Sequence, residues 1–234
     1  MSAASIRARV RAEMTSEIKA VARRHLQTDG ANLSLRAVAR DMGMVSSALY
    51  RYFASRDDLL TALIIDAYNA LGDAVEKADA QVTDRAELRA RWLAVVGAVR
   101  HWALSNQAEY ALLFGSPVPG YAAPADTIAA AARTPVTLLQ ILADGYDRGE
   151  LVPVPDPGLS GALRHDLAGV SGAVAPGVPE DLLLRGMVGW TQLFGAVSFE
   201  LFGQLNNVIE ARAEYFDRQM QVMADLIGLP SPPR

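Results

Sequence analysis

A chain of 234 residues, of which 51% are hydrophobic, is long enough to bury a sizeable core, so extensive disorder is not expected. The absence of cysteine excludes disulfide frameworks, thiolate zinc sites and cysteine nucleophiles. The net charge of −4 is distributed unevenly. Residues 1–56 carry ten Lys and Arg against four acidic residues (+6), and the remaining residues carry 12 basic against 22 acidic side chains (−10). The positive N-terminal part indicates either an anionic partner such as nucleic acid or a solvated basic face.

The N-terminal part has the apolar spacing of four helices. An apolar stripe from Ile6 to Leu26, with steps of three to five residues, predicts a first helix that ends near residues 29–30. A short helix is expected from Ser34 to Gly43, and a third at about 46–53. The fourth begins with Ser55 as its N-cap and extends to about residue 78.

Helical periodicity continues through the rest of the chain. Further helices are predicted at about 84–106, 107–115, 125–148, 179–205 and 209–228. Residues 116–124 and 152–158 break the pattern, residues 159–178 are assigned to no element, and the tail LPSPPR is expected to fray. No internal repeat and no strand-like alternation is visible, so the predicted fold is all-α.

The distribution of charged and apolar residues also predicts where in the cell the protein is found. No apolar signal-peptide core follows the early arginines, and the longest uncharged run in the late helices is Gly186 to Phe199, 14 residues. A membrane-spanning helix needs roughly 20 apolar residues. We therefore expect a soluble, cytoplasmic protein.

Residues 34–53, SLRAVARDMGMVSSALYRYF, have the apolar spacing of a helix-turn-helix. Val38, Ala39 and Met42 face inward on the first short helix, and Gly43 permits the sharp turn. Met44 lies beneath the turn, and Leu49 with Tyr52 or Phe53 returns to the core from the second helix. The second helix of such a motif enters the major groove of DNA.

The exposed side of this second helix suits DNA. Ser46, Ser47 and Ala48 are small enough to let the helix N-terminus approach the duplex, and the hydroxyls can bond to phosphates or base edges. Arg51 is the one side chain of this helix able to hold a guanine with two hydrogen bonds. Arg56, at the start of the next helix, is placed to bind a phosphate.

Residues 1–60 resemble the DNA-binding domain of the TetR family of transcriptional regulators. The family pattern of Leu-Tyr-x-(His/Tyr)-Phe, then a basic residue and Leu-Leu, is met by residues 49–53, by Arg56 and by residues 59–60. Val45 stands where a capping Ser is frequent, so Ser46 is an alternative cap. The resemblance implies that Tyr50, Tyr52 and Arg56 hold the DNA backbone and that Arg36, Ser46, Ser47 and Arg51 contact bases. The full set of candidate DNA-binding residues is Ser34, Arg36, Ser46, Ser47, Ala48, Tyr50, Arg51, Tyr52 and Arg56.

Residues 179–205 and 109–121 resemble one C-terminal subgroup of the same family, with Trp190, Phe194 and Gly195 at its Trp-aromatic/His-Gly positions. Phe194 stands where His is frequent. Family members carry a helical C-terminal domain that binds a small effector and dimerises, so the resemblance implies both. Candidate pocket residues, each of which could instead be plain core, are Trp92, His101, Trp102, Tyr110, Phe114, Tyr121, Tyr146, Met187, Trp190 and Phe194. Candidate dimer-interface residues, for which an intrachain core is the alternative, are Val197, Leu201, Phe216, Met220, Met223 and Ile227.

These features predict a DNA-binding domain at 1–54, a connecting helix at 55–78, an effector-binding and dimerisation domain at 79–229 and a frayed tail at 230–234. The expected function is that of a nucleoid-associated regulator, a repressor in most family members, which binds an inverted-repeat operator as a homodimer. A small apolar or amphipathic effector releases it, the alternative being a DNA-binding regulator without an effector.

An enzyme and a metal-responsive regulator are the remaining alternatives. No phosphate loop, Gly-x-Ser-x-Gly elbow or His-Glu-x-x-His is present. His25, His101 and His165 lie far apart without metal-ligand spacing, and His165-Asp166 alone does not make a catalytic triad. No enzymatic activity, metal or cofactor is expected.

Overall fold

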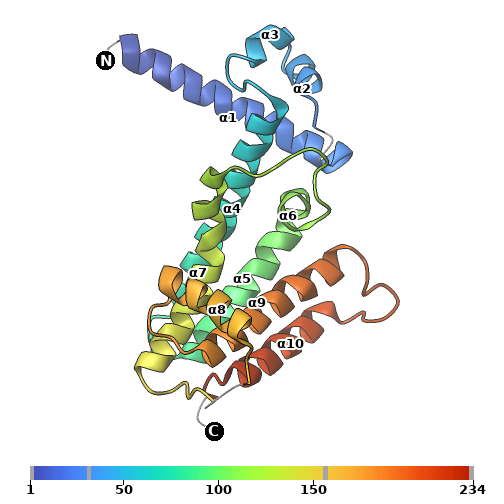
Figure 1. Ribbon diagram of the computed structural model, residues 1–234. Coiled ribbons are helices and arrows are strands. Elements are labelled where there is room, and N and C mark those ends of the chain that lie inside the picture. The colour runs from blue at the N-terminus through green and yellow to red at the C-terminus, as the bar shows by residue number, and fades with distance from the viewer. Residues whose placement is uncertain (1–2, 31–32, 155–157, 232–234) are drawn as a thin grey trace. The chain divides into compact units, whose positions relative to one another are not determined.

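The computed structural model describes residues 3–30, 33–154 and 158–231 (Figure 1). All regular structure in these ranges is helical, and none of it is a strand, which confirms the all-α fold. The chain divides into two compact units, which are described separately. The first unit comprises Met1–Ala70 and Ser105–Ala131, and the second unit comprises Leu71–Leu104 and Ala132–Arg234.

The first unit contains α1 (Ala3–Asp29), α2 (Leu35–Asp41), α3 (Ser46–Leu49), the beginning of α4 (Arg56–Gln81) and α6 (Gln107–Phe114). Its core is the apolar stripe of α1 packed on the inward residues of α2, α3 and α4, among them Ile18, Val38, Leu49 and Leu60. Met42 and Met44 pack on this core, as the sequence predicts.

Helix α6 and the loop after it also belong to the first unit. Helix α6 packs against α1 (Figure 1), and Leu112 and Val118 lie against the core of the helix-turn-helix. The Tyr121 hydroxyl is 2.9 Å from the Thr61 hydroxyl on α4, so the loop is attached to the helix that follows the helix-turn-helix. The segment 109–121 is thus part of the support of that motif.

The second unit contains the rest of α4, then α5 (Leu88–Ser105), α7 (Ile128–Asp147), α8 (Gly161–Val174), α9 (Glu180–Leu201) and α10 (Arg212–Ile227). A short 3-10 helix, η1 (Ala125–Thr127), precedes α7 and belongs, with the first residues of α7, to the first unit. Helices α9 and α10 lie side by side (Figure 1), and the Trp92 indole on α5 donates a hydrogen bond of 3.1 Å to the Met220 carbonyl on α10. No helix in the described ranges is both long enough and apolar enough to cross a membrane.

Two elements differ from the sequence prediction. Helix α3 is only four residues long, and residues 50–52 form a turn in which the Tyr52 amide donates to the Leu49 carbonyl at 2.9 Å. This early ending lets Phe53 turn into the core before α4 begins. Helix α8 occupies residues that the sequence analysis assigns to no element. Its N-cap is Ser160, whose hydroxyl accepts from the Leu163 amide.

Candidate nucleic-acid interface

The turn between α2 and α3 is fixed by local backbone geometry. Gly43 has a φ of +66°, a left-handed conformation that residues with a Cβ adopt rarely. The Met44 amide then donates a hydrogen bond of 2.9 Å to the Ala39 carbonyl, while Ala39 itself is fully buried. At the start of α2 the Ser34 hydroxyl accepts from the Ala37 amide. The two short helices are therefore held together at their junction, which fixes the orientation of α3 relative to α2.

The cap of α3 is settled by the structure. Val45 occupies the N-cap position in an extended conformation and makes no side-chain hydrogen bond, and Ser46 is the first helical residue. Val45 is 70% exposed. The Val45 side chain thus leaves the N-terminal amides of α3 uncapped, at the end that the helix-turn-helix motif presents to DNA.

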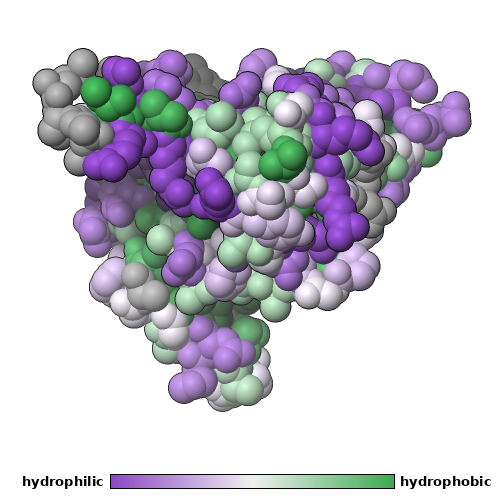
Figure 2. All heavy atoms as spheres, turned by 90° about the horizontal axis from the view of Figure 1, so that it is seen from above, coloured by the Kyte–Doolittle hydropathy of each residue, from purple (hydrophilic) through white to green (hydrophobic). Residues whose placement is uncertain are grey.

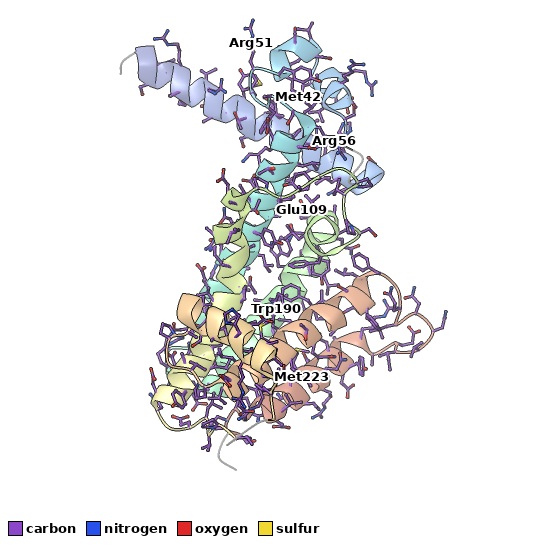
Figure 3. All side chains as sticks on the ribbon, in the orientation of Figure 1. Met42, Arg51, Arg56, Glu109, Trp190 and Met223 are labelled. Atoms are coloured by element: carbon purple, nitrogen blue, oxygen red, sulfur yellow. The ribbon has the colours of Figure 1, made fainter. Side chains whose placement is uncertain are left out.

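Most of the predicted DNA-binding side chains lie on the surface of the first unit. Ser34, Arg36, Ser47, Tyr50 and Arg51 are exposed, and Ser46, Ala48, Tyr52 and Arg56 are partly buried. The side chains of Arg36 and Arg51 make no hydrogen bond or ion pair with any residue that the structure describes. Figure 3 shows Arg51 extending outward from the end of α3. These two guanidinium groups are available to an external anion.

An open groove brings four of the predicted residues together. Its volume is about 540 Å³, and Ser34, Arg36, Tyr50 and Arg56 line it together with Leu33, Leu35, Ala54 and Ser55. The Arg56 Nε donates a hydrogen bond of 3.1 Å to the Leu33 carbonyl, which holds the guanidinium within the lining of the groove. A groove with two arginines and three hydroxyl side chains suits a phosphate group.

Arg11 on α1 belongs to this surface and is absent from the predicted set. Its Nη2 donates a hydrogen bond of 3.0 Å to the Arg51 carbonyl, and its guanidinium lies 5.3 Å from the centroid of the Tyr52 ring. Tyr52 itself is partly buried and packs on the core. Only the crossing of α1 past the end of α3 creates these contacts, so no local sequence pattern could have revealed them.

Several basic residues of the N-terminal part contact carboxylates within the first unit. Lys19 and Arg23 on α1 both bind the Asp66 carboxylate on α4, at 2.7 and 2.6 Å, and the His25 ring is 2.7 Å from Asp41. The surplus positive charge is therefore concentrated on the arginines that remain. Figure 2 shows hydrophilic residues spread over the face seen from above, with hydrophobic residues in small groups between them.

The predicted pocket residues are divided between the two units. Tyr110, Phe114 and Tyr121 belong to the first unit, where Tyr110 is fully buried and its ring centroid lies 4.9 Å from that of Phe114. The other seven belong to the second unit. Trp92 and Trp102 are buried there and His101 is exposed, while Tyr146, Met187, Trp190 and Phe194 are partly buried.

The predicted interface residues lie on α9 and α10, and most of them are covered within one chain. Val197, Phe216, Met220 and Ile227 are buried between the helices of the second unit, and Leu201 and Met223 are partly buried. These helices also expose large apolar side chains on their other faces. The exposed ones are Val188, Phe199, Tyr215, Val222 and Leu226, and Phe202 directly after α9 is exposed as well.

The geometry of the first unit is that of a helix-turn-helix DNA-binding protein, and comparison with known proteins agrees. Residues 18–63 match the family model of bacterial regulatory proteins of the tetR family, and residues 92–223 match the tetracyclin repressor-like C-terminal domain. The chain belongs to the TetR family. It is a DNA-binding transcriptional regulator and not an enzyme.

Individual relatives support this over nearly the whole length. The HTH-type transcriptional regulator Rv1816 of Mycobacterium tuberculosis is 37% identical, over 93% of this chain and 94% of that protein. The crystal structure of SCO4313 is 34% identical with a TM-score of 0.76, covering 93% of this chain and 98% of that one. A protein of unknown function from Rhodococcus sp. RHA1 has the same fold, with a TM-score of 0.67 at 22% identity over 92% of this chain and 93% of that one.

Proposed function

We propose that this chain forms a two-fold dimer that binds an inverted-repeat operator as a repressor and is released by a small apolar or amphipathic effector. The observation that carries the proposal is the exposed polar and basic surface of α2, α3 and the turn after α3. In the proposed docking, α3 lies in the major groove, with its uncapped amides, Ser46 and Ser47 toward the bases. Arg51 reads a base edge, and Arg36 does so from α2.

Phosphates are bound at the rim of this surface. Arg56 is held by the Leu33 carbonyl at one edge of the groove that also contains Ser34 and Tyr50. A guanidinium that is already positioned loses little conformational freedom on binding a phosphate, so it suits a backbone clamp. The partly buried Tyr52 is assigned to the same clamp through its hydroxyl, with its ring fixed beneath Arg11.

Dimerisation is supported by the exposed apolar side chains of α9 and α10. Val188, Gly195 and Phe199 on α9 have the spacing of one helix face, and Tyr215, Val222 and Leu226 on α10 have the same spacing. A groove of about 340 Å³ is lined by Gly195 and Phe199 of the first stripe and by Tyr215 of the second. Its other lining residues are Gln192, Ala196, Leu205 and Gln219. Apolar faces of this kind mark association surfaces, so we assign the interface to these exposed residues in place of the buried ones.

The effector part of the proposal rests on the partly buried aromatic and sulfur-containing residues of the second unit. Trp190 and Phe194 pack edge to face with their ring centroids 6.0 Å apart, and neither is fully covered by protein. Such rings favour a ligand that is apolar or amphipathic. A regulator without an effector remains the second candidate. Addition of a small molecule that binds the protein should weaken operator binding by roughly 1–3 kcal/mol if the first candidate is right, and should leave operator binding unchanged if the second is right.

Selection of duplex DNA from a random library by the purified full-length protein tests the proposal. We expect an inverted repeat whose half-sites are separated by about one helical turn, 10 base pairs, or a multiple of it, bound by two or four chains. Selection of a single, non-repeated site bound by one chain would contradict the dimer. Failure to enrich any sequence would contradict base reading by α3.

A further inference from the structure

The N-terminal part of α1 has no role in the core of the first unit. Residues 5–13 are all exposed, and the first fully buried residue of the helix is Ile18. At 1.5 Å per residue, the segment from Ala3 to Glu13 is about 16 Å long. Figure 1 shows this end of α1 extending beyond the other helices of the first unit. A helix that buries no side chain over residues 5–13 calls for an explanation other than packing in the core.

Three arginines lie on this extension, and they do not face the same way. Arg7 and Arg11 are one helical turn apart and share a face, whereas Arg9 points to the opposite side. The Arg9 Nε is 3.5 Å from the Glu13 carboxylate. The side chain of Arg7 makes no ion pair or hydrogen bond with any residue that the structure describes. The uncompensated charge of the extension is therefore on the Arg7–Arg11 face.

This face is attached to the recognition element. Arg11 donates to the carbonyl of Arg51 at 3.0 Å and lies over the Tyr52 ring, so its position relative to the end of α3 is fixed. The side chain of Arg51 points outward from the end of α3 (Figure 3). Arg51, Arg11 and Arg7 consequently form a continuous basic strip, which we name the α1 strip. It continues the surface of α3 by one turn of α1 toward the free end of that helix.

We propose that Arg7 and Arg11 of the α1 strip bind backbone phosphates of the DNA beyond the base pairs that α3 and Arg51 read, so that each subunit covers sequence flanking its half-site. The inference rests on the proposed docking of α3 in the major groove. Duplex DNA carries one negative charge per about 1.7 Å of its axis, so a basic strip that runs on from the recognition helix meets phosphates wherever the duplex continues. A preformed helix positions these arginines at little entropic cost, and guanidinium groups bind phosphate with paired hydrogen bonds.

The chain offers a matched pair of variants for the test. Arg7→Ala and Arg9→Ala remove the same side chain from the same exposed helix, but only Arg7 lies on the α1 strip. Affinities are measured for the full-length protein on the library-selected duplex, once with about one helical turn of DNA (10 base pairs) beyond each half-site and once trimmed to the half-sites. Circular dichroism establishes that both variants keep their helix content.

We expect Arg7→Ala to lower affinity for the flanked duplex and to reduce the slope of log K against log salt by about one for each subunit bound. Because each subunit of the variant neutralises one phosphate fewer, the deficit should shrink roughly three- to fourfold per subunit between about 50 and 200 mM salt. Arg9→Ala should leave the slope unchanged, and Arg7→Lys should retain most of the affinity. On the trimmed duplex, Arg7→Ala should match the wild type.

Equal effects of Arg7→Ala and Arg9→Ala would overturn the inference, because they would reflect net charge alone. So would a loss on Arg7→Ala that depends on the flanking sequence, because that would mean base reading. Arg51→Ala separates this inference from the proposed function. If Arg51→Ala lowers operator affinity as expected and Arg7→Ala does not change it, only the role of the α1 strip is refuted. If Arg51→Ala leaves operator affinity unchanged, the docking of α3 itself is refuted.

Discussion

At the scale of single residues, Arg51 and Arg56 differ in how the fold constrains them. Arg51 is exposed and its guanidinium is unattached to the described residues, while the Arg56 Nε is bonded to the Leu33 carbonyl. We expect Arg56→Ala to weaken binding to all sequences similarly and to reduce the salt slope by about one per subunit, because the variant neutralises one phosphate fewer. Arg51→Ala should cost roughly 1–3 kcal/mol on the selected operator and little on random DNA.

Fluorescence anisotropy on both duplexes over a range of salt concentrations measures these differences. If the two variants show the same loss on selected and on random DNA, the assignment of Arg51 to base reading is wrong. A loss confined to the selected duplex for Arg56→Ala would in turn contradict its role as a phosphate clamp.

Phe53 provides a residue-scale prediction about stability. Its side chain is 7% exposed and belongs to the core of the first unit, so Phe53→Ala leaves a cavity. The variant should lose about 3–5 kcal/mol of unfolding free energy. Urea denaturation followed by circular dichroism measures this loss. A loss below that of an exposed control, Tyr50→Ala, would show that the core does not depend on the ring.

The charge network at Arg91 makes stability depend on pH. Arg91 is fully buried, with its Nε 2.8 Å from Asp79 and its Nη1 2.7 Å from Asp144. Burial alone would raise the pKa of Asp79, but hydrogen bonds and charges from Arg91 and Arg85 lower it below its ordinary value of 3.8 overall. A carboxyl whose pKa is lowered by folding stabilises the protein above its unfolded pKa, and this contribution disappears as pH falls through the folded pKa.

Arg91→Ala should therefore destabilise the protein by about 3–5 kcal/mol near neutral pH, because two partly buried carboxylates are left without their shared partner. The gap to the wild type should narrow as the pH falls below 3.8, the ordinary pKa of Asp79. Urea denaturation at pH 7 and at successively lower pH values measures the gap. A gap that is independent of pH would mean that poorer packing, and not charge, causes the destabilisation.

At the scale of elements, the N-terminus of α3 lacks a stabilising side-chain cap, so its backbone amides stay accessible at the cost of some stability. Val45 has an extended backbone with φ −70° and ψ 139°, which suits an N-cap, but its side chain cannot accept a hydrogen bond. We expect Val45→Ser to raise the unfolding free energy by roughly 0.5–1 kcal/mol, because the new hydroxyl satisfies an amide of α3. Urea denaturation of the variant beside Val45→Ala measures this. Equal stabilities of the two variants would show that no cap forms.

The helix-turn-helix could be predicted from the sequence because its determinants are local. The inward residues Val38, Ala39 and Leu49 and the turn at Gly43 lie within a few residues of one another, and all are found as predicted. Helix α8 could not be predicted in the same way. Gly161, Gly169 and Gly172 reduce its helix propensity, and of its described side chains only Leu167 is buried.

The proposed binding surfaces depend on contacts between distant segments, which periodicity does not reveal. The apolar stripes that contain Val197 on α9 and Met220 on α10 have the same sequence pattern whether the partner helix belongs to the same chain or to another. In the structure both are covered within one chain, and the exposed apolar residues lie on neighbouring positions. Similarly, the contact of Arg11 with Arg51 joins residues 40 positions apart.

At the scale of the whole molecule, the proposed dimer makes DNA affinity depend on α9 and α10. Phe199→Arg places a charge on the exposed stripe, where Phe199 is 55% exposed, whereas Val152→Arg places it on a more exposed apolar site (72%) outside these helices. We expect Phe199→Arg to favour the 25.1 kDa monomer and to weaken operator binding together, because a dimer must bury the introduced charge. Val152→Arg should change neither property.

Sedimentation at micromolar concentration, paired with operator titration, checks this prediction. A wild-type protein that sediments only as a 25.1 kDa species would contradict the dimer outright. A dimeric Phe199→Arg variant would place the interface on other residues.

The trio of Asp79, Arg91 and Asp144 also restricts which substitutions can be accepted one at a time during evolution. Each member comes from a different helix, α4, α5 or α7, and removal of one alone leaves a charge without full compensation beside the core. Replacement of all three by well-packed apolar residues can be neutral or even stabilising, yet every single step toward it is costly. Related chains are therefore expected to keep the three positions together or to have exchanged them together, so an alignment of relatives should show them as a covarying set.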